Sequence, residues 1–147
     1  MPTKAIPEGY HSITPYLVVD GAERLIDFLK KAVGAKERFM MKCSEGKIAH
    51  AELQIGDSIV MLADSSPQWQ PTTAMIHVYV EDIDQTYQRA VAAGGKPVKE
   101  PANQFYGDRS GSVRDAFGNQ WHFATHVEDV TPEEMERRAK EWLDKQV

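Results

Sequence analysis

Three histidines and one glutamate have the residue types and the strand-like spacing that could support chemistry. His50 and Glu52 alternate with apolar residues in one stretch, while His77 and His122 stand in two later ones. Because residues two apart point to the same face of a strand, all four could face one side of a sheet. Such a nitrogen-rich set would suit zinc, nickel or iron. The four are scattered along the chain, however, and we favour hydrogen bonding to neighbours or to a ligand.

The sequence gives weaker support to nucleophilic catalysis. Cys43 has no histidine nearby in the sequence to activate its thiol, so an unreactive cysteine is expected. Ser110 lies in a run with a glycine at each end, but this run precedes an expected strand, whereas the nucleophile of a hydrolase follows one. We therefore predict a flexible loop at Ser110. His126 follows the last expected strand and could equally be a surface residue.

Aromatic residues in two connecting segments carry more information. Trp69 lies in the connection between the halves of the chain, and Phe105 and Tyr106 precede the last hairpin. A fully solvated loop does not need such apolar area. These rings could cover a binding site and stack on a planar or cationic ligand, with Asp108 and Arg109 as charged anchors. Alternatively, they pack across a subunit contact or at the edge of the core, and both interpretations stay open.

Composition narrows the class of protein. The 147 residues are 41% hydrophobic and 27% charged, which predicts one packed domain. The net charge of -5, with no compensating Lys/Arg stripe, argues against nucleic acid as a partner. The single cysteine allows no intrachain disulfide and suits a reducing compartment. Residues 1–6 have no signal-like apolar core and no run reaches the roughly 18 residues of a membrane span, so we expect a cytoplasmic protein without membrane contact.

The first half of the chain predicts a strand, a helix and a hairpin. The apolar run 16–19 is typical of a strand, after which Asp20 can cap a helix that ends at Gly34. Residues 47–63 then form two apolar stretches around the turn-forming sequence Gly56-Asp57-Ser58. This pattern predicts a half-buried strand followed by its hairpin partner.

The second half repeats this order of elements. Residues 76–80 read as a strand and Asp82 as the cap of a second helix. Sliding the sequence by 61 positions pairs Val19 with Val80, and Gly34 with Gly95. Identities between the halves are few, so the support comes from the order of the elements. We predict duplicated modules at about residues 11–66 and 73–126 within a single domain spanning residues 1–147.

The end of the chain predicts a second hairpin and a further helix. Trp121 and Phe123 alternate with His122 and are expected in the core. Thr131-Pro132-Glu133-Glu134 is a capping box with proline at the first helical position, which predicts a helix over about 131–145. Its apolar stripe consists of Met135, Ala139, Trp142 and Leu143. We expect this amphipathic helix to cover a sheet or a subunit contact.

The repeated order of strand, helix and hairpin is similar to the paired βαβββ modules of the vicinal oxygen chelate superfamily, which contains glyoxalases, bleomycin-resistance proteins and extradiol dioxygenases. The sequence resembles its PhnB-like branch in Thr14-Pro15-Tyr16-Leu17, in Gly56-Asp57-Ser58 with Met61, and in the runs 105–111 and 115–121. The resemblance covers about residues 13–126. It implies an α+β fold in which the two modules form a curved mixed sheet with a U-shaped cleft, commonly completed or flanked by a second subunit.

The resemblance also implies where a metal would bind. Enzymes of this superfamily place four ligands, usually His, Gln or Glu, on the strands that face the cleft. By motif these positions are Thr14, Met61, Met75 and His122. A hydroxyl and two thioethers supply neither charge nor a strong lone pair to a divalent cation. We therefore expect no metal cofactor at the inherited site, and a divalent metal at the displaced histidines and Glu52 is the alternative.

Binding of a small organic molecule is the function that we favour from the sequence. The cleft would be lined by Thr14, Met61, Met75, His77 and His122. Further candidate ligand contacts are Tyr16, His50, Glu52, Trp69, Phe105, Tyr106, Asp108 and Arg109. Noncovalent binding of a partly aromatic or apolar molecule implies sequestration or carriage.

Two other functions remain open at this point. One is an enzyme, either a metal-dependent lyase, isomerase or dioxygenase, or a metal-free catalyst with His122 as general base. The other is a dimeric interaction module with a vestigial cleft. In each case we expect a homodimer, because paired modules leave sheet edges and an open flank that the C-terminal stripe could cover.

Overall fold

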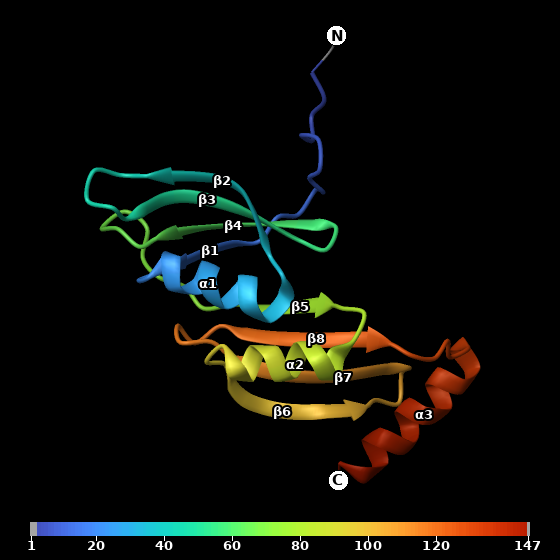
Figure 1. The fold of residues 1–147 in the computed structure, drawn as a ribbon. Coiled ribbons are helices and arrows are strands. Elements are labelled where there is room, and N and C mark those ends of the chain that lie inside the picture. The colour runs from blue at the N-terminus through green and yellow to red at the C-terminus, as the bar shows by residue number, and fades with distance from the viewer. Residues whose placement is uncertain (1–2, 147) are drawn as a thin grey trace.

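The computed structural model describes residues 3–146, which form two four-stranded sheets and three helices (Figure 1). The strands of the first sheet are β1 (Tyr16–Val19), β2 (Lys36–Lys42), β3 (Ile48–Ile55) and β4 (Ser58–Asp64). Those of the second are β5 (Met75–Tyr79), β6 (Lys96–Asn103), β7 (Asp108–Arg114) and β8 (Gln120–His126). The helices are α1 (Ala22–Val33), α2 (Ile83–Ala92) and α3 (Pro132–Lys145). The first two residues of the segment 1–6, for which no signal core is expected, lie outside the described range.

The two sheets have the same topology, which confirms the predicted duplication. Their strand orders are β1-β4-β3-β2 and β5-β8-β7-β6, and in each sheet the first pair is parallel while the other two are antiparallel. Tyr16 lies opposite Met61 in the first sheet, and His77 lies opposite His122 in the second. Both residues of the second pair follow those of the first by 61 positions. The α+β fold of two βαβββ modules is therefore as expected.

The starts of α1 and α2 show the duplication at the level of single hydrogen bonds. Asp64, at the end of β4, accepts from the backbone N–H of Ala22 at 2.9 Å, and Thr125 accepts from that of Ile83 at 2.9 Å. Asp64 also accepts from Gly21. The prediction that Asp20 caps α1 is therefore wrong, because the cap position is Gly21 and a carboxylate from the neighbouring strand supplies the acceptor. Asp82 does cap α2, as predicted.

The C-terminal ends of the helices and strands correspond less closely between the two modules than the starts of the helices do. Gly34 ends α1 in the left-handed region, with φ of 67°, but in the second module the residue with positive φ is Gly94. Gly95 has no positive φ, and a Cβ on it would lie 2.9 Å from the carbonyl oxygen of Ala90. The predicted equivalence of Gly34 and Gly95 is thus displaced by one residue. The Val19 and Val80 equivalence holds to within one residue, since Val19 ends β1 and Val80 directly follows β5.

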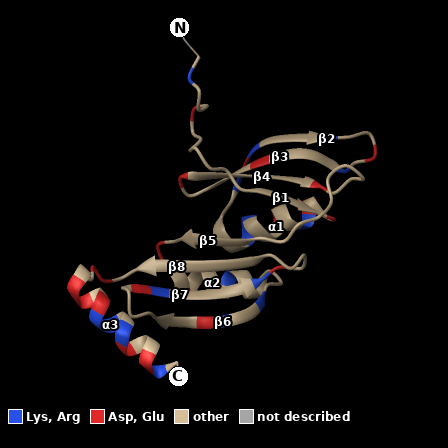
Figure 2. Cartoon of the chain, turned by 180° about the vertical axis from the view of Figure 1, so that it is seen from behind, with Lys and Arg blue, Asp and Glu red and all other residues tan. Residues whose placement is uncertain are grey.

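Both central helices lie on the same side of the two sheets and contact each other there (Figure 1). The core fills the space between them and the sheets, and it includes Trp121 and Phe123, as predicted. Ser110 is buried inside β7, so the prediction of a flexible loop at this residue is wrong. The opposite faces of both sheets carry no helix, and β1, β5 and β8 show few charges in the view from behind (Figure 2). We call these the helix-free faces.

The outer strands β2 and β6 are exposed along nearly their whole length. Strand β2 carries charged residues at both ends, and β6 contains Pro97 and Pro101. Each outer strand pairs irregularly with its inner neighbour, with two shifts of register along the ladder. Neither strand therefore shows the alternation of buried and exposed residues that marks β3.

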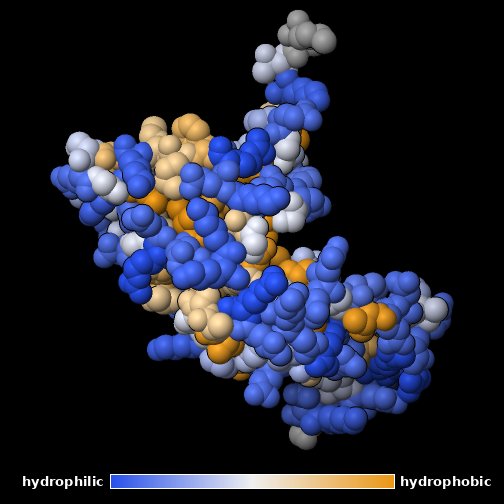
Figure 3. Space-filling model, in the orientation of Figure 1, coloured by the Kyte–Doolittle hydropathy of each residue, from blue (hydrophilic) through white to orange (hydrophobic). Residues whose placement is uncertain are grey.

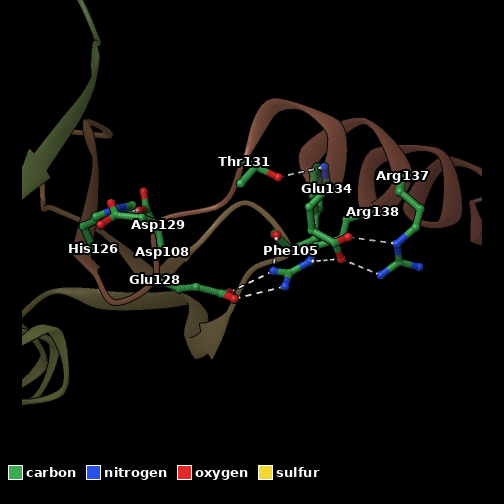
Figure 4. Close-up of polar contacts among 9 residues, drawn as sticks. All are labelled: Phe105, Asp108, His126, Glu128, Asp129, Thr131, Glu134, Arg137 and Arg138. Atoms are coloured by element: carbon green, nitrogen blue, oxygen red, sulfur yellow. Dashed lines mark hydrogen bonds and ion pairs between the residues drawn. The ribbon is translucent and has the colours of Figure 1, made fainter.

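Helix α3 begins at Thr131, which caps it as predicted, and none of its residues is fully buried. Arg138 joins it to the rest of the chain through the carbonyl oxygen of Phe105 at 3.1 Å and through both carboxylate oxygens of Glu128 (Figure 4). The rings of Phe105 and Trp142 are 5.8 Å apart. Within the chain α3 therefore lies against the loop before β7.

Candidate functional site

A pocket of about 790 Å³ opens on the helix-free face of the first sheet. Its walls are mainly apolar and come from β1, β3, β4 and the connection after β4, and they include Tyr16, Val18, Ile48, Ala63, Trp69 and Thr72. The connection is held in place because the backbone N–H of Thr72 donates to Val18, and Ser66 and Trp69 exchange backbone hydrogen bonds. Trp69 itself is 68% exposed. We call this cavity the first-sheet pocket.

A chain of hydrogen-bonded side chains begins at the wall of this pocket. The hydroxyl of Tyr16 lies 2.9 Å from Nδ1 of His50, and Nε2 of His50 lies 2.9 Å from Oε2 of Glu52. The hydroxyl of Tyr10, in the segment before β1, donates to the other carboxylate oxygen of Glu52. Hydrogen bonds from Tyr10 and His50 lower the pKa of Glu52. Both ring nitrogens of His50 are therefore engaged, and neither offers a free lone pair to a metal.

His77 and His122 form a separate pair on the helix-free face of the second sheet. Their ring centroids are 5.0 Å apart, and the ring of Tyr79 lies 4.9 Å from that of His77. Burial, and after it the neighbouring His77, lowers the pKa of His122 below 6.5. At neutral pH His122 is thus an uncharged imidazole, which can accept or donate one hydrogen bond.

Asp108 is engaged within the second module. It is 3% exposed and accepts hydrogen bonds from the hydroxyl of Tyr79 and from Nδ1 of His126, both at 2.8 Å. The other ring nitrogen of His126 contacts Asp129 (Figure 4). Hydrogen bonds to Asp108 and then Asp129 raise the pKa of His126, so these carboxylates favour the charged imidazolium. His126 is half-exposed and also forms hydrogen bonds to two carboxylates, which its position in the sequence did not indicate.

The other residues predicted around the last hairpin also have partners inside the chain. Arg109 forms a two-pronged ion pair with Asp84 of α2, with distances of 2.8 and 2.9 Å. Phe105 and Tyr106 pack against each other edge to face. Together with the contact of Phe105 to α3, these partners favour a role for this loop in attaching the C-terminal helix.

The residues predicted to line one cleft are divided between the two modules. Thr14 and His77 line a second pocket of about 590 Å³ beside the turn between β3 and β4. Met61 lies half-buried in β4, and Met75 is 67% exposed in β5. Within residues 3–146 no three or more His, Cys, Asp or Glu side chains are arranged to hold a metal ion. The four residues considered for a displaced metal site form two pairs on different sheets.

Sequence reasoning missed several residues of the first-sheet pocket and of the hydrogen-bonded chain. Tyr10 lies in a segment outside the repeat, where the sequence has no periodic pattern. Thr72 lies in the connection that contains Trp69, and Ile48 begins β3. Val18 alternates with buried residues of β1, so the period of two would have placed it beside Tyr16 on the helix-free face.

The two βαβββ modules, with candidate binding residues on the helix-free faces, define a small α+β protein of the paired-module class. The family model described as Glyoxalase/Bleomycin resistance protein/Dioxygenase superfamily matches residues 9–123. The chain belongs to this superfamily, which confirms the resemblance found in its sequence.

The chain is also similar to individual proteins. The chain is 38% identical over 136 residues to an uncharacterised protein of Mycobacterium bovis, a match that covers 85% of this chain and 90% of that protein. Among solved structures it is similar to TioX from Micromonospora sp. ML1, with 27% identity, a TM-score of 0.69, and coverage of 80% and 99% of the two chains. It shares its fold with a PhnB protein from Bacillus cereus, with 19% identity, a TM-score of 0.64, and coverage of 78% and 99%.

No helix among residues 3–146 is both long enough and apolar enough to cross a membrane.

Proposed function

We propose that this protein binds a small organic molecule noncovalently in the first-sheet pocket, in a role of sequestration or carriage. The volume and mainly apolar lining of this pocket are the observation that carries the proposal. Ligand sites are concave and mostly apolar, with a few polar groups that orient the ligand. Tyr16 and Trp69 supply aromatic surface to a flat molecule, and Thr72 supplies a hydroxyl.

Binding without a metal is part of the proposal. The two ring nitrogens of His50 already contact Tyr16 and Glu52, and the inherited positions offer one imidazole beside a hydroxyl and two thioethers. Such a donor set does not fit the octahedral oxygen and nitrogen site of a divalent cation. Apolar walls and aromatic rings then provide the binding energy.

The dye 8-anilinonaphthalene-1-sulfonate, a flat and largely apolar probe, is expected to bind in the first-sheet pocket with a rise in its fluorescence. Trp69→Ala should weaken this binding about tenfold, equivalent to about 1.4 kcal/mol, because an exposed aromatic wall is lost. Val127→Ala is the control, since it removes an exposed apolar side chain that lies outside the pocket. Equal affinities of the two variants would contradict the assignment of the pocket.

The metal-free part of the proposal is tested on the same protein. Treatment with EDTA should change neither the affinity for the dye nor the thermal midpoint, because a metal bound only to the folded state would have raised that midpoint. Elemental analysis that finds about one equivalent of transition metal per chain, lost in His122→Ala, would instead favour the metal-dependent enzyme.

We also propose a homodimer in which a second copy covers exposed apolar surface and completes the cleft. On the helix-free faces Tyr16, Phe39, Met41, Met75 and Tyr79 are all exposed. On the side of the molecule that carries α1 and α2, hydrophobic residues also reach the surface near β2 and along the boundary between the modules (Figure 3). A monomer seldom leaves so many large apolar side chains in water. A second copy across the helix-free faces would place Met61, Met75, His77 and His122 in the enclosed space.

Light scattering at micromolar concentration is therefore expected to give twice the mass of the chain. On α3, Trp142 is 46% and Leu143 58% exposed, which makes this helix a candidate for part of the contact. Leu143→Glu should shift the equilibrium towards monomer, whereas Lys140→Glu, an exposed change on the same helix, should not. A wild-type protein that scatters only as a monomer would contradict the dimer.

A further inference from the structure

Tyr16 belongs both to the wall of the first-sheet pocket and to the hydrogen-bonded chain of His50, Glu52 and Tyr10. The wall of the pocket and this hydrogen-bonded chain therefore share the side chain of Tyr16. In the sequence these residues come from distant segments, and the pairing of β1 with β4 and of β4 with β3 brings Tyr16 and His50 to the same face. This connection goes beyond what apolar binding requires.

The direction of each hydrogen bond in the chain follows from the acceptor at its end. An ionised carboxylate only accepts, so Glu52 accepts from Nε2–H of His50 and from Tyr10. In neutral His50 the other nitrogen, Nδ1, then carries the lone pair, and the hydroxyl of Tyr16 donates to it. The remaining lone pairs on the oxygen of Tyr16 are left for a donor in the pocket. A ligand with an O–H group fits this arrangement.

We propose, on the basis of the binding function above, that the first-sheet pocket takes a planar weak acid of the phenol or enol type and accepts its proton through Tyr16 onto His50. The O–H bond of the ligand breaks and its proton bonds to the oxygen of Tyr16. The original hydroxyl proton of Tyr16 moves to Nδ1 of His50. No electrons are gained or lost, and the products are a bound phenolate or enolate and an imidazolium.

Glu52 lies 2.9 Å from Nε2 of His50, where its carboxylate can pair with an imidazolium. Two titratable groups face His50, namely Tyr16 from β1 and Glu52 from β3. Tyr10, in the segment before β1, and Arg38, in β2, lower the pKa of Glu52. Glu52 keeps its negative charge beside the new imidazolium because its hydrogen bonds to Tyr10 and His50 lower its pKa.

The pKa of Tyr16 and the charged residues that line the pocket determine which group carries the negative charge. Burial, and after it Glu52, raises the pKa of Tyr16, so Tyr16 stays a hydroxyl and the negative charge rests on the more acidic ligand. Lys47 and Asp64 both line the pocket, so the positive charge near that anion is accompanied by a carboxylate. The pocket is thus matched to an acid stronger than tyrosine.

4-Nitrophenol is a suitable probe, because its phenolate absorbs visible light and its phenol does not. Calorimetry measures binding, and absorbance below the probe's own pKa measures the ionised fraction of the bound probe. We expect binding to wild-type protein to raise the ratio of phenolate to phenol about tenfold, a shift of about one pKa unit. Because the proton stays in the complex, the heat of binding should not depend on the ionisation enthalpy of the buffer.

Two variants test the path of the proton. His50→Gln and Tyr16→Phe should both still bind the probe but lose the rise in phenolate, because each interrupts the relay at a different atom. His126→Gln, at the end of β8 on the other sheet, is the matched control and should retain both binding and ionisation. Circular dichroism confirms that each variant is folded.

The outcomes separate this inference from the proposed function. Absence of 4-nitrophenol binding while the anilinonaphthalene dye still binds would overturn this inference alone, and absence of binding of both probes would overturn both. Binding without a rise in phenolate would overturn the proton transfer alone and leave the binding function standing. A rise that persists in His50→Gln would likewise overturn the relay, because Lys47 or solvent would then account for the ionisation.

Discussion

Asp115→Ala is expected to lower the free energy of unfolding by about 3 to 5 kcal/mol, because it removes a buried charge whose donors would then lack a partner. Asp115 accepts from the backbone N–H groups of Phe117 and Asn119, at 2.8 and 3.0 Å. It also accepts from the side-chain amide of Asn119 and from the indole N–H of Trp121, at 3.1 and 2.9 Å. One carboxylate thus fixes the turn between β7 and β8 and the largest side chain of the core. Urea denaturation followed by circular dichroism measures the loss.

The duplicated fold supplies a matched control for this substitution. Asp57 occupies the corresponding turn between β3 and β4, where it is exposed and accepts only from the hydroxyl of Ser58. Asp57→Ala should therefore change stability by less than about 0.5 kcal/mol. A similar loss at the two positions would show that turn conformation, and not the buried hydrogen bonds, accounts for the effect.

Asp64→Ala should cost about 2 to 4 kcal/mol at neutral pH, because one side chain satisfies three backbone donors. It accepts from Gly21 and Ala22 at the start of α1, both at 2.9 Å, and from Ile48 of β3 at 2.7 Å. Asp20→Ala is the control, since this exposed residue forms no cap on α1 and should have little effect. Thermal unfolding of the three proteins at pH 7 provides the comparison.

The cost of Asp64→Ala should also depend on pH. Burial by itself raises the pKa of Asp64, but the three backbone N–H groups and Lys47 outweigh it, so that the pKa lies below the ordinary 3.8. A carboxyl with a lowered pKa in the folded state contributes its full stabilisation above the pKa of the unfolded chain. This contribution disappears as the pH falls through the folded pKa. The difference in thermal midpoint between wild type and variant should be constant above about pH 5 and shrink below about pH 4.

Much of the fold could be predicted from the sequence because the inner strands and both central helices each have one buried side. Strand β3 alternates, and the repeat of 61 positions aligns β1, α1 and β4 with β5, α2 and β8. The outer strands β2 and β6 show little alternation, because neither buries a full face. Asp64 could not be recognised as the cap of α1, since its acceptor role depends on a contact between distant segments.

The candidate site was predicted less completely than the fold. The period of two allowed His50, Glu52, His77 and His122 to face one side of a sheet. In the structure His50 and Glu52 lie with Tyr16 on the first sheet, and His77 lies beside His122 on the second. The period could not show that the two pairs lie on separate sheets, because that depends on how the modules pack through α1 and α2. Nor could it reveal Tyr10, whose contact with Glu52 comes from a segment without regular structure.

The exposed outer strands bear on how the protein behaves in a crowded solution. An unpaired strand edge offers backbone groups to any extended segment of another molecule, and growth of such pairs leads to fibrils. Pro97 and Pro101 each remove a backbone donor from β6, and its irregular ladder bends the edge away from a flat template. Strand β2 carries three cations and one carboxylate, Glu37, and its net positive charge repels a second copy of the same strand. The exposed edges of both sheets therefore disfavour aggregation, β6 through its prolines and β2 through its charge.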